Sequence, residues 1–252
     1  MIKKLTVLGT GTIVPVSGRT CAGYLLETDS DLVLLDCGPG VLHALADINI
    51  DYTHLHHILI THFHWDHVSD LFALIISMNI RSGGKSQLHI SGPVGIRDML
   101  HQAKKYLFQH QDDYIPEQLQ ITEVTPGSFT VNDLSVETDL TGHTDRSLCY
   151  RISDDSGKTI FYSGDTVYND RIVRLGHRAD IAVIECSHSE HYAHPEGHMR
   201  WPDVQKFDRE AQPEHLVVTH FYEDFLADTI MDQYAEDSHI TFAHDKQEFL
   251  IK

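Results

Sequence analysis

The 252-residue sequence predicts a single domain of the α/β class, and three observations support this. Short runs of β-branched and aliphatic residues alternate with segments whose apolar residues have helical spacing. Hydrophobic residues make up 41% of the chain, which is enough for a sizeable core. Domains of this class and length commonly form one unit. We therefore expect residues 1–252 to form one domain.

The first half of the chain is predicted to begin with strands over residues 2–8, 22–27 and 31–36. A helix opens at residues 38–40 and runs to about Ala46. A strand ends near Ile60, and the helix that follows has a broad apolar surface, which suits burial inside the domain or contact in a homodimer. Next come a strand over residues 87–91, a helix from Pro93 to about Phe108, and a polar loop over 109–117 that could border a pocket.

The second half is predicted to be richer in strands. Turns at Pro126-Gly127 and Asn132-Asp133 separate the first of these strands. Strands are expected over residues 119–124, 128–131, 134–140, 147–152, 158–162, 181–184, 215–219, 240–243 and 249–251. Helices are expected over residues 202–211 and 226–234.

Residues 62–67, His-Phe-His-Trp-Asp-His, carry four side chains that can bind a metal ion. Imidazole and carboxylate suit zinc and similar divalent ions. His62 and His64 alternate in an extended segment, so both can face one ion. Asp66 and His67 lie where a helix begins, so they can reach a second ion about 3.5 to 4 Å away. The alternative is a His-rich surface loop in a chain with 20 histidines.

The charge balance favours small substrates. The net charge is −18, from 37 acidic and 19 basic residues, and no Lys/Arg-rich run is present, so binding of nucleic acid is disfavoured. The four cysteines form no CxxC pair and are expected to be reduced. No apolar run approaches 18 residues, and the N-terminal segment is typical of a strand, so we expect a cytoplasmic protein without a membrane span.

Further motifs follow the metal-binding segment in a fixed order. They are Leu8-Gly9-Thr10-Gly11-Thr12, Leu35-Asp36-Cys37-Gly38, Gly142-His143, Ser163-Gly164-Asp165-Thr166, Ile184-Glu185, Gly197-His198 and Thr219-His220-Phe221. Together with residues 62–67, this set resembles the metallo-β-lactamase superfamily, and in particular its phosphodiesterase branch, which contains ribonuclease Z. The resemblance implies a four-layer αββα sandwich.

The resemblance also implies a ligand set for two divalent ions. His62, His64 and His143 would hold one ion, Asp66, His67 and His220 the other, and Asp165 would touch both. Asp36 would support the metal-binding loop, although an ordinary strand-end cap is an equal alternative. His188, His191 and His194 are most simply solvated loop histidines.

We expect hydrolysis of a small phosphodiester or cyclic phosphate by a hydroxide held between the ions, which are zinc or else manganese or iron. Asp66, Glu185 and His198 are the expected catalytic residues, with His198 as general acid oriented by Glu185.

Three alternatives stay open. The first is a ribonuclease Z-like tRNA 3′-processing endonuclease, but positions 143 and 165 are only 22 apart, which leaves no room for the tRNA-binding arm that the bacterial enzymes carry there. The second is a hydrolase of thioesters, lactones or sulfate esters. The third is a non-catalytic metal-binding protein.

Overall fold

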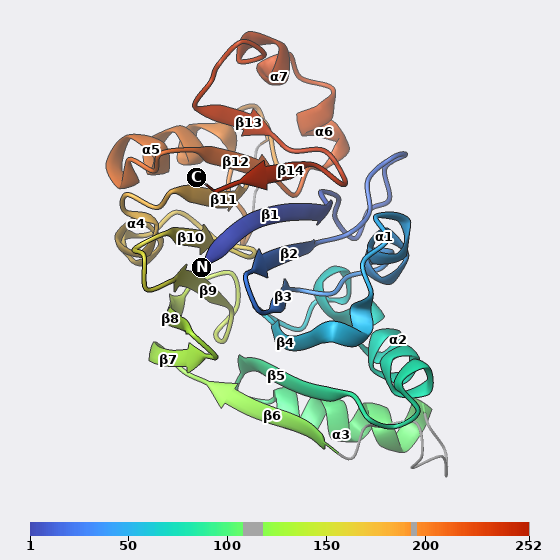
Figure 1. Ribbon diagram of the computed structural model, residues 1–252. Coiled ribbons are helices and arrows are strands. Elements are labelled where there is room, and N and C mark those ends of the chain that lie inside the picture. The colour runs from blue at the N-terminus through green and yellow to red at the C-terminus, as the bar shows by residue number, and fades with distance from the viewer. Residues whose placement is uncertain (108–117, 193–195, 252) are drawn as a thin grey trace.

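The computed structural model describes residues 1–107, 118–192 and 196–251. Two seven-stranded β-sheets face each other, and helices cover their outer surfaces (Figure 1). The loop predicted over residues 109–117 lies outside the described residues, as does Phe108. Among the described residues, none of the helices is long and apolar enough to cross a membrane.

The first sheet has the strand order β14-β1-β2-β3-β4-β5-β6, and β3 to β6 are parallel neighbours. Its strands are β1 (Ile2–Gly9), β2 (Gly23–Thr28), β3 (Leu32–Leu35), β4 (Leu55–Leu59), β5 (Gln87–Pro93), β6 (Gln118–Val124) and β14 (Glu248–Leu250). The helical elements on its outer side are α1 (Val41–Asp47), η1 (Tyr52–His54), α2 (Trp65–Ser82) and α3 (Ile96–Leu107). The apolar side chains of these helices and of the sheet form one buried cluster.

The second sheet has the order β13-β12-β11-β10-β9-β8-β7, with β10 to β13 parallel. Its strands are β7 (Gly127–Val131), β8 (Leu134–Leu140), β9 (Leu148–Ser153), β10 (Thr159–Tyr162), β11 (Ile181–Glu185), β12 (Leu216–Thr219) and β13 (Ile240–Phe242). The associated helices are α4 (Asp170–Gly176), α5 (Trp201–Ala211), α6 (Glu223–Leu226) and α7 (Ile230–Gln233). A second buried cluster joins them to the outer face of this sheet.

A third cluster lies between the sheets and takes side chains from both of them. Two tyrosines also bond across this interior. The Tyr24 hydroxyl is 2.8 Å from Thr219 Oγ1, and the Tyr150 hydroxyl donates to the carbonyl oxygen of Ile60 at 2.7 Å. The helix, sheet, sheet and helix layers confirm the predicted αββα sandwich.

Two helix predictions are wrong, and one helix was not predicted. The helix expected from Pro93 begins at Ile96, because β5 stays paired with β6 through Pro93 and the chain turns only at Gly95, where φ is +106°. The helix expected over residues 226–234 is two short helices. The side chains of Phe225 and Ile230 are both buried, and five helical residues would turn them about 140° apart. The third element, α4, was not predicted; its N-cap is Asn169.

The loop between β1 and β2 is fastened by a carboxylate from the far end of the chain. Asp245 accepts hydrogen bonds from the backbone N–H and hydroxyl groups of both Thr10 and Thr20. Thr10 also accepts a bond from the backbone N–H of Phe221 at 3.1 Å. The loop is therefore held beside His220, the residue that precedes Phe221.

Candidate metal centre and proton donor

The predicted site residues lie at one edge of the sandwich. Residues 62–67 follow β4, and the remaining residues follow or end strands of the second sheet that run in one direction. His143 follows β8, Asp165 follows β10, Glu185 ends β11 and His220 follows β12. Because the carboxyl ends of these strands meet at a single edge, residues far apart in sequence converge there.

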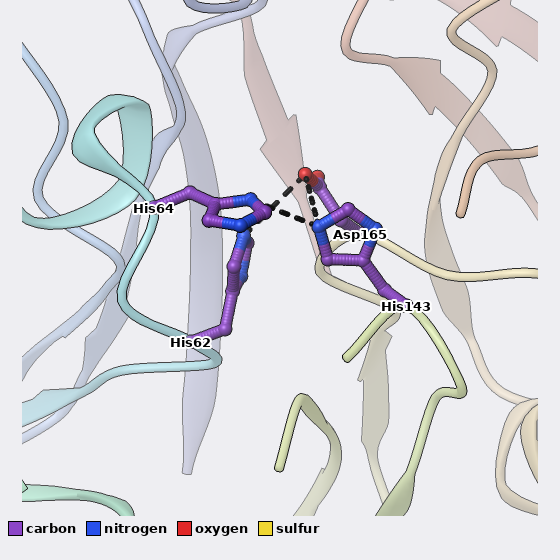
Figure 2. A group of neighbouring side chains, drawn as sticks. All are labelled: His62, His64, His143 and Asp165. Carbon is purple, nitrogen blue, oxygen red and sulfur yellow. Dashed lines mark hydrogen bonds and ion pairs between the residues drawn. The ribbon is translucent and has the colours of Figure 1, made fainter. Parts of the chain in front are cut away.

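The first group contains His62, His64, His143 and Asp165, whose side chains point toward one another in Figure 2. The Nε2 atoms of His62 and His143 lie 3.5 and 3.6 Å from Asp165 Oδ2. His64 presents its Nδ1 atom, which is 2.9 Å from His143 Nε2. These are the residues predicted for one ion.

The second group contains Asp66, His67, Asp165 and His220. The Nε2 atoms of His67 and His220 lie 3.1 and 3.3 Å from Asp165 Oδ1, and Asp66 Oδ2 lies 3.4 Å from His220 Nε2. Asp165 thus turns one carboxylate oxygen toward each group. This is the arrangement expected of a carboxylate that bridges two ions.

Several buried atoms in these groups have no hydrogen-bond partner, although buried polar atoms are normally paired. They are Nε2 of His62, Nε2 of His67 and Oδ1 of Asp165. Burial lowers the pKa of His62 to about 4, so its imidazole is neutral at neutral pH and can donate a lone pair to a cation. Neutral imidazole and carboxylate are the donors that divalent ions accept, so the residues fit a pair of such ions.

The other ring nitrogen of four of these histidines is already bonded, which fixes the direction of each ring. Nδ1 of His62 lies 3.0 Å from Thr61 Oγ1, Nδ1 of His67 is 2.7 Å from Asp36 Oδ2, Nδ1 of His143 is 2.7 Å from the Gly197 carbonyl oxygen, and Nδ1 of His220 is 3.0 Å from Ser187 Oγ. The site is therefore oriented by the protein before any ion binds.

The buried carboxylate of Asp36 holds the metal-binding loop through hydrogen bonds to Thr61 and His67. Its carboxylate accepts bonds from the backbone and hydroxyl of Thr61 at 2.8 and 2.7 Å, and from the Tyr162 hydroxyl at 2.6 Å, in addition to the bond with His67. Its φ of +56° lies in the left-handed region, which non-glycine residues rarely adopt. These contacts match a role of Asp36 in supporting the metal-binding loop better than a role as an ordinary strand-end cap.

A Glu-His pair adjoins the two groups. His198 Nδ1 lies 2.9 Å from Glu185 Oε1 and 4.0 Å from Asp165 Oδ2. Burial alone would lower the pKa of His198, but the charge and hydrogen bond of Glu185 outweigh burial and raise the pKa to about 9. Glu185 is almost completely buried and also accepts the backbone N–H of Thr166 at 2.8 Å. A protonated imidazole in this position can donate a proton, and Glu185 fixes its orientation.

Sequence reasoning missed Ser187. Its hydroxyl is 2.7 Å from Glu185 Oε2, 3.0 Å from His220 Nδ1 and 3.2 Å from His198 Nδ1. It therefore links the Glu-His pair to a residue of the second metal-binding group. A lone serine carries no sequence signal, although its place two residues after Glu185 could have drawn attention to it.

The remaining histidines divide into separate cases. His188 is not a solvated loop residue, because it is buried and its Nδ1 lies 3.0 Å from Asp224 Oδ1. The side chain of His191 is 79% exposed and stands apart from the site, as expected. His194 lies outside the described residues. His56 and His57 lie in β4 but away from the site, next to Asp31 and His89 respectively.

Two groups of side chains that can bind cations lie at one edge of an αββα sandwich of the metallo-β-lactamase fold. Together with the sequence relatives, they define a metal-dependent hydrolase, as the sequence motifs indicated. The chain belongs to the family described as Anti-Pycsar protein Apyc1, whose model matches residues 3–249.

Other relatives agree with this class. The chain is 27% identical to the probable metallo-hydrolase YhfI of Bacillus subtilis over 224 residues, 86% of each protein. It is 28% identical to a ribonuclease Z of Mycobacterium bovis over 193 residues, 71% of this chain and 69% of that protein. The crystal structure of YhfI matches with a TM-score of 0.83 at 21% identity, covering 100% of both chains. The structure of a diphosphatase of the PhnP family matches with a TM-score of 0.79 at 18% identity, covering 100% of this chain and 98% of that chain. These two structures share the fold.

Proposed function

We propose that the protein hydrolyses small phosphodiesters or cyclic phosphates. The observation that carries this proposal is the Glu185–His198 pair, which lies beside the bridging position of Asp165. Hydrolysis of a phosphodiester breaks the bond between phosphorus and a poorly leaving alkoxide, and that oxygen needs a proton as the bond breaks. A hydrolase whose leaving groups need no proton would have less use for such a pair.

The donor atoms of the two groups would hold two divalent ions, which we take to be zinc, with manganese or iron also compatible with these ligands. Bound there, the ions supply Lewis-acid chemistry, since they lower the pKa of water and offset charge on the phosphoryl oxygens. The chain contributes position: Asp165 fixes the separation of the groups, and Asp66 completes the second group. We assign all seven residues of these two groups as metal ligands.

His198 performs the proton transfer in this scheme. Its Nδ1 faces Glu185, so its Nε2 carries the proton that passes to the leaving oxygen. Glu185 keeps the ring in this orientation and stabilises the charged imidazolium until the proton leaves. The backbone N–H of Met199, which is 3.3 Å from Glu185 Oε2, holds the carboxylate in place from the other side.

The substitution His198→Ala tests this role. We expect it to lower turnover of a diester with a poor leaving group by about 10²- to 10⁴-fold, because one positioned proton transfer is worth that much. Metal content, measured by atomic emission, should stay that of the wild type. A nitrophenyl ester needs less protonation and should show a smaller defect. His191→Ala serves as the control, and unchanged turnover of the poor substrate by His198→Ala would contradict the assignment.

The second candidate is tRNA 3′-end processing, because several relatives are ribonucleases Z. Two observations weigh against it. The described residues between His143 and Asp165 form only the β9–β10 hairpin and its flanks, so no arm projects there. The net charge of −18 repels a long polyanion. We therefore propose a small-molecule phosphate ester as substrate, in a cytoplasmic setting that matches four free cysteines.

A further inference from the structure

A hollow of about 420 Å³ opens beside His198, and none of the seven proposed metal ligands is among the described residues that line it. His188, His198 and Tyr222 form part of its wall, together with Val14 from the loop that Asp245 fastens. The ring centroids of His198 and Tyr222 are 6.2 Å apart, and those of His198 and His188 are 6.3 Å apart. Because His198 is the proposed proton donor, whatever occupies this hollow lies on the side of the leaving oxygen.

The wall of the hollow is rigid and largely aromatic. The ring of His188 stacks on that of Tyr222, with centroids 4.9 Å apart and planes 23° apart. Asp224 fixes His188 through the bond to Nδ1, and its second oxygen accepts the backbone N–H of Ser189 at 3.2 Å. The backbone of His188 is bonded on both sides, to Met199 and Trp201. This wall can therefore receive a substituent without rearrangement.

The hollow carries more negative than positive charge, and the positive charge of His198 in its wall is paired with Glu185 at 2.9 Å. Glu196, Glu223 and Asp224 are among the described residues that line it, and no lysine or arginine is among them. Two divalent cations held by the neighbouring groups would attract the phosphate of the ester. A second anionic group placed in the hollow would face carboxylates instead, and like charges at close range repel each other.

We propose that this hollow is the subsite for the leaving group of the ester, and that it takes an uncharged aromatic or aliphatic substituent and rejects an anionic one. The proposal rests on the proposed function. It narrows the substrate class to monoanionic phosphodiesters whose leaving alcohol carries no phosphate or carboxylate of its own.

The test uses two ligands of equal shape and different charge. One is a non-hydrolysable phosphonate with a 4-carbamoylbenzyl group, and the other carries a 4-carboxylatobenzyl group. Binding of each to the metal-loaded protein is measured by calorimetry. We expect the carbamoyl ligand to bind about tenfold more tightly than the carboxylate ligand, which corresponds to one like-charge contact near the surface. The matching aryl methyl phosphates are then assayed for turnover.

Substitutions assign the selectivity to the hollow. Glu223→Gln removes an exposed carboxylate and leaves the bonds of Asp224 with His188 and Ser189 in place. We expect it to reduce the ratio of the affinities for the carbamoyl and carboxylate ligands by half or more. The double variant Glu223→Gln, Asp224→Asn should bind both ligands nearly equally. Glu137→Gln, an exposed site on β8, makes the same change in net charge and should leave the preference intact.

The outcomes separate the two proposals. Equal binding of both ligands by the wild-type protein, or a preference that survives in the double variant, overturns the subsite. A preference that disappears in the double variant supports the subsite even when neither aryl phosphate is hydrolysed, and that absence of turnover would count against the proposed function alone.

Discussion

Ser187 shows how a single hydroxyl can serve two parts of the site. The carboxylate of Glu185 only accepts hydrogen bonds, so the Ser187 hydroxyl must donate to it and can then accept from His220 Nδ1. That bond leaves the lone pair of His220 on Nε2, which faces Asp165. Ser187 is thus a positioning residue for a metal ligand as well as a contact of the proton donor.

We expect Ser187→Ala to weaken binding of one of the two ions by about 10- to 100-fold, the usual effect of losing a partner that orients a ligand. Ser187→Thr should restore the affinity, because it keeps the hydroxyl. Metal stoichiometry after dialysis against graded chelator checks this. Loss of both ions in parallel, or of neither, would contradict the assignment to His220.

His57 provides a pH-dependent contribution to stability away from the site. It is buried, and burial together with the charge of His89 lowers its pKa from 6.5 to about 4. A histidine with a pKa lowered in the folded state contributes stability above pH 6.5 and loses it as the pH falls toward 4, because the unfolded chain takes up the proton first. Between pH 7 and pH 5 this amounts to roughly 1 to 2 kcal/mol.

Accordingly, His57→Gln should show a smaller loss of unfolding free energy between pH 7 and pH 5 than the wild type, by on the order of 1 kcal/mol. Urea unfolding of the metal-free proteins at the two pH values measures this. Parallel pH profiles of the two proteins would exclude the contribution of His57.

Among the individual site residues, those that lie in compact motifs were the easiest to predict from the sequence. Residues 62–67 were found because four donors are adjacent in sequence. His143, Asp165 and His220 were found only through the order of family motifs, since each is isolated. Ser187 and the Asp224–His188 pair were missed because the histidine partners of Ser187, and Asp224 as the partner of His188, lie 11 to 36 positions away. Such partners become visible only after folding.

Among the elements, the segment that enters α1 packs most tightly against the metal-binding loop. A Cβ atom on Gly38 would lie 1.8 Å from the backbone oxygen of Asp66, far inside contact distance. The neighbouring Cys37 N–H donates to the His67 carbonyl oxygen at 2.7 Å. Only glycine at position 38 allows α1 and α2 to begin this close together.

Gly38→Ala is therefore expected to lower the free energy of unfolding by about 3 kcal/mol or more and to weaken metal binding, because the shift falls on Asp66. Gly84→Ala is the control: its φ is +83° but no atom lies within 4 Å, so it should lose only about 1 kcal/mol and keep the metals. Urea unfolding and metal analysis distinguish the two. Full metal occupancy in a destabilised Gly38→Ala would show that the loop adapts.

Strands were easier to predict than helices in this chain. Most strands are short apolar runs between turn residues, and their positions follow from composition. The helix limits depend on tertiary contacts: Pro93 stays in a paired strand, and the break after α6 lets Phe225 and Ile230 both reach the core. Local preference did not contain that information.

At the scale of the whole molecule, the metal-binding groups connect the two sheets. His62, His64, Asp66 and His67 follow the first sheet, whereas His143, Asp165 and His220 belong to the second. Bound ions would thus cross-link the layers. Both the single domain over residues 1–252 and the homodimer suggested by the apolar surface of α2 stay predictions.

Removal of the metals should therefore lower the thermal midpoint. A ligand that binds only the folded state stabilises that state by about 2.7 kcal/mol when its free concentration is 100 times its dissociation constant. We expect chelation to lower the midpoint by several degrees and re-addition of zinc to restore it, as followed by calorimetry. Asp165→Ala should abolish the response and His191→Ala should keep it. A midpoint insensitive to chelator would mean that the ions do not join the layers.

The pairing of β14 with β1 and the grip of Asp245 on Thr10 and Thr20 have a consequence for biosynthesis. On the ribosome, the loop that carries Val14 emerges early but lacks its carboxylate anchor until Asp245 leaves the exit tunnel. The nascent chain can thus assemble most of both layers while one wall of its hollow is still unsecured. Competence as an enzyme should therefore arise only after Asp245 has been synthesised and has bound Thr10 and Thr20.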